Sequence, residues 1–268
     1  IMQELGLDYE TLKELNPHLI MTSITPFGQS GPYRDYKAYA INCSAAGGMS
    51  NTIGKPDREP LTLPLSQGQY QSGALGATAT MTALLARELT GQGQHVDISE
   101  AEAWAMLHTG YVVHSFVFDG KIRIRAGHRV PAAYPYAILP CKDGYMSITA
   151  IRGYQWKAFL ELMGGGQVPE WYSKDPRFQD RYVIGREYAD EMDAMLAPWL
   201  MARTKEEIFT SCQERAIPFT PVKSIDEVVN EPQLNERGYF VGVDHEQTGP
   251  LKYPGAPFRF YETPWAID

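Results

Sequence analysis

The sequence has few cysteines, no long apolar run and no excess of positive charge. Its three cysteines among 268 residues are too few and too widely spaced for a disulfide framework or a CxxC metal or redox motif. No apolar run approaches the roughly 20 residues of a transmembrane helix, and the N-terminal stretch lacks the apolar region of a signal peptide. A formal net charge of −8 gives no basic field to attract nucleic acid or an anionic membrane. These absences predict a cytoplasmic protein that binds neither nucleic acid nor a membrane.

The composition and length that remain predict an α/β protein of two domains. Hydrophobic residues make up 44% of the chain and charged residues 21%, as is usual for globular proteins, and the length suits two domains. We expect a larger α/β domain over residues 1–120, a smaller α+β domain over 121–235, and a segment at 236–268 that returns to the large domain. The chain starts at Ile1 as if within an element, so we expect an excerpt of a longer protein.

Local patterns predict most of the elements. In the first part we expect a helix capped by Asp8, strands at 19–24 and 95–98, a helix of small residues at 72–89, and a long helix from a Ser99/Glu102 capping box to about 118. Small residues would let the 72–89 helix pack close to a sheet or a ligand. In the second part we expect a hairpin at 136–150 that turns at Asp-Gly, helices at 154–163, 187–201, 204–215 and from 224, and strands at 239–245 and 251–253.

Several segments, in order along nearly the whole chain, resemble the class III CoA-transferase family. They include LNPHLI (15–20), SITPFGQSGPY (23–33), KAYA (37–40), AGG (46–48), LLARELTGQGQHVD (84–97), PCKDGY (140–145), DPRF (175–178), PFTPV (218–222), EPQL (231–234), RG (237–238) and PGAP (254–257). The family includes carnitine CoA-transferases, formyl-CoA transferase and α-methylacyl-CoA racemase.

The resemblance implies a fold and a substrate class. It implies a large Rossmann-like CoA-binding domain, incomplete in this chain, a smaller α+β domain, and an interlinked homodimer in which each chain threads the other. A family member would start well before Ile1 and continue past residue 268. The implied substrates are an acyl-CoA thioester and a carboxylic acid acceptor, with no permanently bound cofactor and no metal.

The resemblance assigns CoA binding to Lys37, Ala38, Tyr39 and Ala40. The residue types agree with that role, because Lys37 offers a point cation for a phosphate and Tyr39 an aromatic face for adenine. The alternative is a surface lysine beside a half-buried tyrosine.

Gln69 occupies the position of the family's catalytic aspartate, four residues before Gly73. In the family that carboxylate attacks the thioester carbonyl and carries CoA to the acceptor as an aspartyl thioester. A neutral amide cannot do this. The one carboxylate between 61 and 96 is Glu88, roughly 28 Å further along the helix at 1.5 Å per residue. Asp57 and Glu59 would need the preceding loop to fold back.

Two roles are open for the amide-rich stretch 67–71, and two for the protein. The amides could hold a thioester carbonyl or a carboxylate, or they could form a polar loop that caps the following helix. The protein could be a CoA-transferase with altered chemistry, or a catalytically silent CoA-thioester-binding subunit or domain. A racemase is disfavoured, because Tyr39, Ala40 and Gln69 stand where its histidine and aspartate would be.

Overall fold

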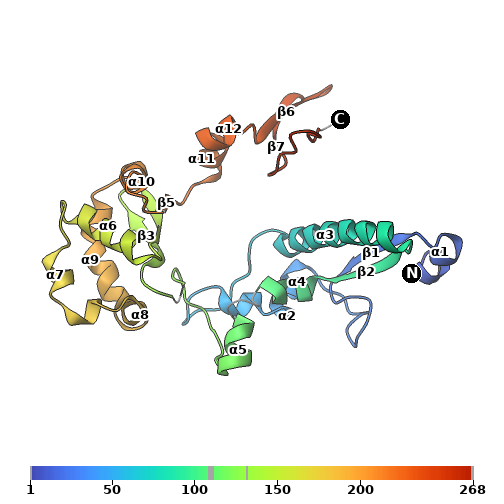
Figure 1. The fold of residues 1–268 in the computed structure, drawn as a ribbon, viewed down its shortest axis with the longest axis horizontal. Helices are drawn as coiled ribbons and strands as arrows, with labels where there is room; N and C mark the ends of the chain where they lie inside the picture. Colours follow the sequence, from blue (N-terminus) through green and yellow to red (C-terminus); the bar gives the residue numbers. More distant parts are fainter. Residues whose placement is uncertain (1, 108–111, 131, 267–268) are drawn as a thin grey trace. The chain divides into compact units, whose positions relative to one another are not determined.

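The computed structural model describes residues 2–107, 112–130 and 132–266. The chain divides into two compact units, Ile1–Val130 and Pro131–Asp268 (Figure 1). The sequence predicts this boundary at 120, whereas the structure has it between Val130 and Pro131. The expected return of residues 236–268 to the first domain stays a prediction.

The first unit is built around a parallel pair of strands. Its elements are α1 (Tyr9–Leu15), β1 (Ile20–Thr25), α2 (Ala40–Ala46), η1 (Met49–Thr52), α3 (Gln67–Thr90), β2 (Gln94–Ser99), α4 (Glu100–Leu107) and α5 (His114–Asp119). The register of β1 and β2 runs from Ile20 opposite Gln94 to Thr25 opposite Ser99. Parallel strands need a crossover connection, and the long helix α3 lies along both strands (Figure 1). The unit therefore confirms the predicted α/β class.

The start of the chain forms as its local signals predict. Asp8 accepts a hydrogen bond from the Thr11 N–H at 3.2 Å and caps α1. The helix ends at Leu15, because a residue that precedes a proline avoids the helical conformation. The ring of Tyr9 in α1 stacks on His95 of β2 with centroids 5.4 Å apart, which attaches the helix to the strand pair.

Small residues bring α3 close to the sheet, as expected from the sequence. A Cβ atom added at Gly76 would lie 2.8 Å from Cδ1 of Ile24 in β1. The hydroxyls of Thr80 in α3 and Thr22 in β1 are 2.6 Å apart. A larger side chain at Gly76 would therefore need Ile24 to shift.

The predicted helix over 100–118 corresponds to α4 and α5. The Ser99 hydroxyl accepts a hydrogen bond from the Glu102 N–H at 3.3 Å, which confirms that half of the predicted capping box. The middle of the predicted helix, at 108–111, lies outside the described residues.

The second unit contains two hairpins and several helices. Its elements are β3 (Tyr136–Cys141), β4 (Gly144–Thr149), α6 (Gly153–Met163), α7 (Glu170–Ser173), η3 (Pro176–Phe178), α8 (Arg181–Val183), η4 (Ile184–Tyr188), α9 (Ala189–Met201), α10 (Lys205–Gln213), β5 (Thr220–Pro221), α11 (Ile225–Val229), α12 (Pro232–Glu236), β6 (Phe240–His245) and β7 (Gly249–Pro254). The antiparallel pairing of β3 with β4 and of β6 with β7 confirms both predicted pairs of strands. Cys141 pairs with Gly144, so the first turn consists of Lys142 and Asp143, one residue earlier than the predicted Asp143 and Gly144.

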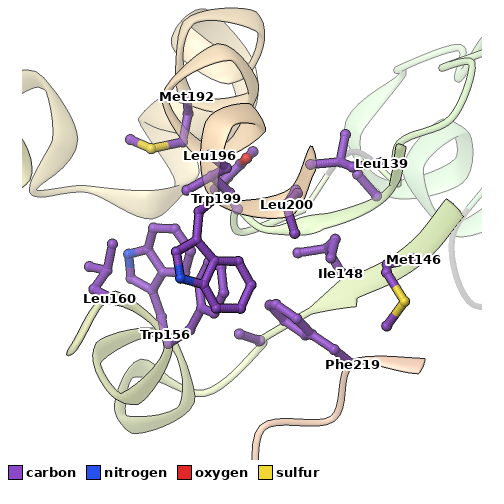
Figure 2. Close-up of a cluster of buried hydrophobic side chains, with 14 of the residues drawn as sticks. Leu139, Met146, Ile148, Trp156, Leu160, Met192, Leu196, Trp199, Leu200 and Phe219 are labelled. Carbon is purple, nitrogen blue, oxygen red and sulfur yellow. The ribbon is translucent and has the colours of Figure 1, made fainter. Parts of the chain in front are cut away.

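A buried apolar cluster holds residues 134–219 of this unit together. Burial alternates along β3, so that Leu139 points inward, and Ile148 of β4 does the same. Figure 2 shows side chains from this hairpin, α6 and α9 converging in one cluster. Phe159 is fully buried there, with ring centroids 4.7 Å from Phe219 and 5.4 Å from Trp199. Aromatic packing of this kind supplies much of a domain's buried area.

Two further features concern the chain as a whole. Cys43, Cys141 and Cys212 are all free and buried, which confirms the prediction that the chain has no disulfide framework. Within residues 2–107, 112–130 and 132–266, no helix is both long and apolar enough to cross a bilayer.

Removing the Phe159 ring tests this core. We expect Phe159→Ala to lower the free energy of unfolding of the second unit by about 3–5 kcal/mol, because it leaves a cavity. Tyr154→Ala is the matched control on the same helix, since Tyr154 is 67% exposed; it should change stability by at most about 0.5 kcal/mol. Urea denaturation followed by tryptophan fluorescence measures both. Equal losses in the two variants would contradict the assigned core.

Candidate functional site

The loop that follows β1 is tied to its neighbours by hydrogen bonds at the carboxyl end of the strand pair. The Gln29 N–H donates to Oδ2 of Asp97 in β2 at 2.9 Å. The Pro26 carbonyl accepts the N–H of Ala101 in α4 at 3.0 Å, and the Cys43 thiol of α2 at 3.9 Å. The loop, α2 and α4 therefore meet at one backbone carbonyl. In open α/β sheets, ligands bind at this end of the strands.

Residues 37–40 lead from this loop into α2. Lys37 is exposed, Ala38 and Ala40 are partly buried, and the Tyr39 side chain is 79% exposed. The Tyr39 N–H donates to Oδ1 of Asn42 at 3.0 Å, which fixes the start of the helix. The alternative of a half-buried tyrosine is wrong, because this ring has little packing. The cation and the ring both face solvent, and their role in CoA binding stays a prediction.

An exposed aromatic pair precedes this segment and was not singled out from the sequence. The rings of Tyr33 and Tyr36 stack with centroids 4.9 Å apart, although the two side chains are 54% and 59% exposed. Exposed stacked rings offer flat apolar faces, and Tyr36 directly precedes Lys37 in the sequence. The sequence feature that could have indicated this stacked pair is the spacing of two tyrosines in a glycine- and proline-rich loop.

Gln69 lies in the first turn of α3 and not in a loop. The helix begins at Gln67, and its N-cap Ser66 makes no side-chain capping bond. Both predictions for this place, a helix that starts at 72 and a polar capping loop at 67–71, are therefore wrong. The reason is a tertiary contact, because Gly68 is buried against α4 and packing outweighs its low helix propensity.

The surroundings of Gln69 suit the binding of negative charge. Its side chain is exposed, and the N–H groups of a first helical turn have no partners within the helix. The aligned peptide dipoles make that end of the helix positive. Glu88 lies in the same helix, roughly 28 Å further along at 1.5 Å per residue, so it cannot act at Gln69.

Glu100, the first residue of α4, is a buried carboxyl that the sequence reasoning missed. Glu100 is 6% exposed and Trp104 is 3% exposed. A Cβ atom at Gly68 would collide with both Oε1 of Glu100 and Nε1 of Trp104, so these groups lie directly against the backbone of α3. Both atoms are buried without a hydrogen-bond partner. Burial raises the pKa of Glu100, and the nearby Cys43 thiol and Trp104 indole offset part of that effect.

The first turn of α4 is where α2 and α3 meet. A Cβ atom at Gly47, the residue that ends α2, would collide with Cβ of Trp104 and the carbonyl oxygen of Ala101. Each of the three helices packs against the other two (Figure 1). Burial raises the pKa of Cys43 to about 11, so its thiol stays protonated and is a poor nucleophile. The helix that follows residues 37–40 and the helix that carries Gln69 thus share one support.

The sequence feature that could have indicated a buried Glu100 is its spacing of four residues from Trp104. Residues four apart lie on the same face of a helix, and tryptophan is usually a well-buried anchor. An acidic residue in a first turn is ordinarily a solvated partner of the helix dipole. Its position in the sequence therefore predicts a solvated Glu100 and not a buried one.

A further cavity in the first unit is lined by other residues. It has a volume of about 840 Å³ and lies between α3, β2 and α4, with Leu75, Thr82, His95, Ile98 and Met106 among its lining residues. Neither Gln69 nor residues 37–40 line it. Within the described parts of the chain, no group of His, Cys, Asp and Glu side chains could hold a metal ion.

Comparisons with known proteins agree on one family. A family model described as CoA-transferase family III matches residues 1–268. Subunit BbsE of succinyl-CoA:(R)-benzylsuccinate CoA-transferase from Thauera aromatica is 31% identical, over 98% of this chain and 65% of its own length. Succinate–glutarate CoA-transferase from Agrobacterium fabrum is 27% identical, over 97% of this chain and 63% of its own. The chain therefore spans about 63–65% of the length of these relatives.

A solved structure shows the same fold. A CAIB/BAIF family protein from Brucella suis superposes with a TM-score of 0.80 at 28% identity. The match covers 98% of this chain and 67% of that one.

Substituting two glycines of α3 tests the contact at Gly68. We expect Gly68→Ala to destabilise the first unit by about 1–3 kcal/mol, because the methyl group overpacks against Trp104. Gly73→Ala is the matched control, since a Cβ atom there meets nothing within 4 Å; it should stabilise α3 by about 0.5–1 kcal/mol. Hydrogen exchange of α3 peptides measures both. A stabilising Gly68→Ala would show that α3 does not approach α4 as described.

Proposed function

The chain belongs to CoA-transferase family III, and from that premise we propose that it is part of an enzyme that transfers CoA from an acyl-CoA to a carboxylic acid. The printed names of two relatives support this proposal, since both are CoA-transferases of dicarboxylic acids. Succinyl-CoA is the first donor to test, because it appears in the name of the Thauera relative. We extend the proposal to a Rossmann-like large domain, an interlinked homodimer and a cytoplasmic location.

The observation that carries the proposal is the place of Gln69. Its amide is exposed in the first turn of a 24-residue helix, and that helix packs against α2, which begins at Ala40. In the proposed complex, Lys37 contacts a phosphate of CoA and Tyr39 lies against the adenine. The thioester then lies near the positive end of α3.

Without a carboxylate at position 69, the chemistry has to run through the substrates. We place the Gln69 amide N–H at the thioester carbonyl, where it stabilises the developing oxyanion. The acceptor carboxylate attacks that carbonyl, the C–S bond breaks, and CoA leaves as a thiolate. The thiolate then attacks the acceptor-derived carbonyl of the mixed anhydride, which releases the donor acid and forms the new thioester. No covalent bond to the protein is needed.

A second function is a catalytically silent CoA-thioester-binding subunit paired with an active partner. The neutral amide at Gln69 favours it, because an amide cannot serve as the family's nucleophile. The printed name of the Thauera relative, a subunit, also fits such an arrangement. A racemase stays disfavoured, because Tyr39, Ala40 and Gln69 stand where its histidine and aspartate would be.

Substitution of Gln69 separates the two functions. If the amide holds the oxyanion, the intact protein exchanges CoA and Gln69→Ala lowers kcat by about 100-fold or more, the effect of losing an oxyanion donor. Equal kcat values for wild type and Gln69→Ala would contradict a role for Gln69. A wild type without activity and an active Gln69→Asp would favour the silent subunit. Hydroxylamine trapping is the control, because an acyl group on any carboxylate would show a displaced nucleophile.

Truncation of Lys37 tests the CoA contact. We expect Lys37→Ala to weaken acyl-CoA binding by about ten-fold, the loss of one charge-assisted hydrogen bond. Binding of the matching acyl-pantetheine, which lacks the nucleotide phosphates, should not change. Lys13→Ala on α1 serves as an exposed control. A similar loss for both ligands would place Lys37 elsewhere than at a phosphate.

A further inference from the structure

We propose that Glu100 is held as a neutral carboxylic acid beneath the first turn of α3, and that it acts there with Trp104 as a positioning residue for Gln69. This inference rests on the proposed role of Gln69. It assigns to the site a carboxyl group that lies outside the segment matched to the family's catalytic residues.

Glu100 lies against the backbone of α3 at Gly68, the residue that precedes Gln69. Gly68 is buried against Glu100 and Trp104, while its neighbour Gln69 is exposed. Successive residues in a helix point about 100° apart, so the contact at Gly68 sets the depth and rotation at which Gln69 is presented. The Ser72 hydroxyl donates to the Gly68 carbonyl at 2.5 Å, which holds the same turn from within the helix.

The surroundings of Glu100 favour its neutral form. No described residue forms an ion pair with it, and its Oε1 atom has no hydrogen-bond partner. The Cys43 thiol of α2 and the Trp104 indole of α4 face it and lower its pKa, whereas α3 presents the side-chain-free Gly68 and no charge. Burial of an unpaired carboxylate is costly, whereas a carboxylic acid is tolerated. Burial outweighs the effect of Cys43 and Trp104, so the pKa of Glu100 is raised.

The same facts argue against Glu100 as a substitute nucleophile. A neutral acid is a weak nucleophile, and its buried Oε1 atom lies against the α3 backbone. The group that would face a thioester is Gln69, and Glu100 acts through it.

The first part of the test reads the protonation state and needs no activity. In the intact protein, the isotope-edited infrared band of a protonated carboxyl should be present at neutral pH and absent in Glu100→Gln. A folded-state pKa above that of the unfolded chain means that stability is lost as pH rises from the unfolded value. The protection of α3 and α4 amides should therefore fall relative to Glu100→Gln as the pH rises above the pKa of a glutamate in the unfolded chain. Glu102→Gln, an exposed change in the same turn, should leave that slope as in wild type.

The second part reads the position of Gln69. The side-chain amide NMR signal of Gln69, identified by its loss in Gln69→Ala, should stay in place in Glu100→Gln and shift in Glu100→Ala. The rate of CoA exchange should likewise be less affected in Glu100→Gln than in Glu100→Ala. Glu100→Gln should stay within about two-fold of wild type, and Glu100→Ala should lose about ten-fold in kcat with little change in KM, because misplacement costs rate and not binding.

Three results would overturn the proposal. They are the absence of the protonated band in wild type, an unmoved Gln69 signal in Glu100→Ala, and an acyl group trapped on Glu100. A wild type that does not exchange CoA would defeat the proposed function alone, because the infrared, hydrogen-exchange and NMR results still decide the placement of Glu100.

Discussion

The close approach of α3 to α4 at Gly68 is the contact on which the arrangement of the first unit depends. It is possible because Gly68 has no side chain where the Glu100 carboxyl and the Trp104 indole lie. At the other side of Trp104, Gly47 makes an equally close approach from the end of α2. Two glycines therefore bring three helices together around one tryptophan, and β1 is reached from the same helix α3 through Gly76.

That contact separates two polar side chains into different environments. Gln69 faces solvent at the positive end of α3, while Glu100 of α4 is enclosed against Gly68, the residue that precedes Gln69. An exposed amide keeps its donors for a ligand, whereas burial raises the pKa of the enclosed carboxyl. The proposed site thus has its donor at the surface and its acid in the support below.

Local signals predicted the elements whose ends are fixed by the chain itself. The Asp8 cap, the proline that ends α1 and the β3–β4 turn each depend on neighbours in sequence. The start of α3 was missed because Gly68 is a poor helix former whose place is decided by α4. Glu100 was missed for a related reason, because a first-turn acid is ordinarily solvated and only the fold encloses it. The family likeness identified position 69, but it could not supply the carboxyl beneath it.

The Gly68 contact also limits how this part of the chain can diverge. A relative that keeps both the acid at Glu100 and the indole at Trp104 has no room for a side chain at Gly68, so the three positions must change together. A relative with a smaller residue at Trp104 is released from that limit and can carry alanine or serine at the turn. The identities at these three positions would therefore sort relatives into two groups, independently of the residue that each carries at Gln69.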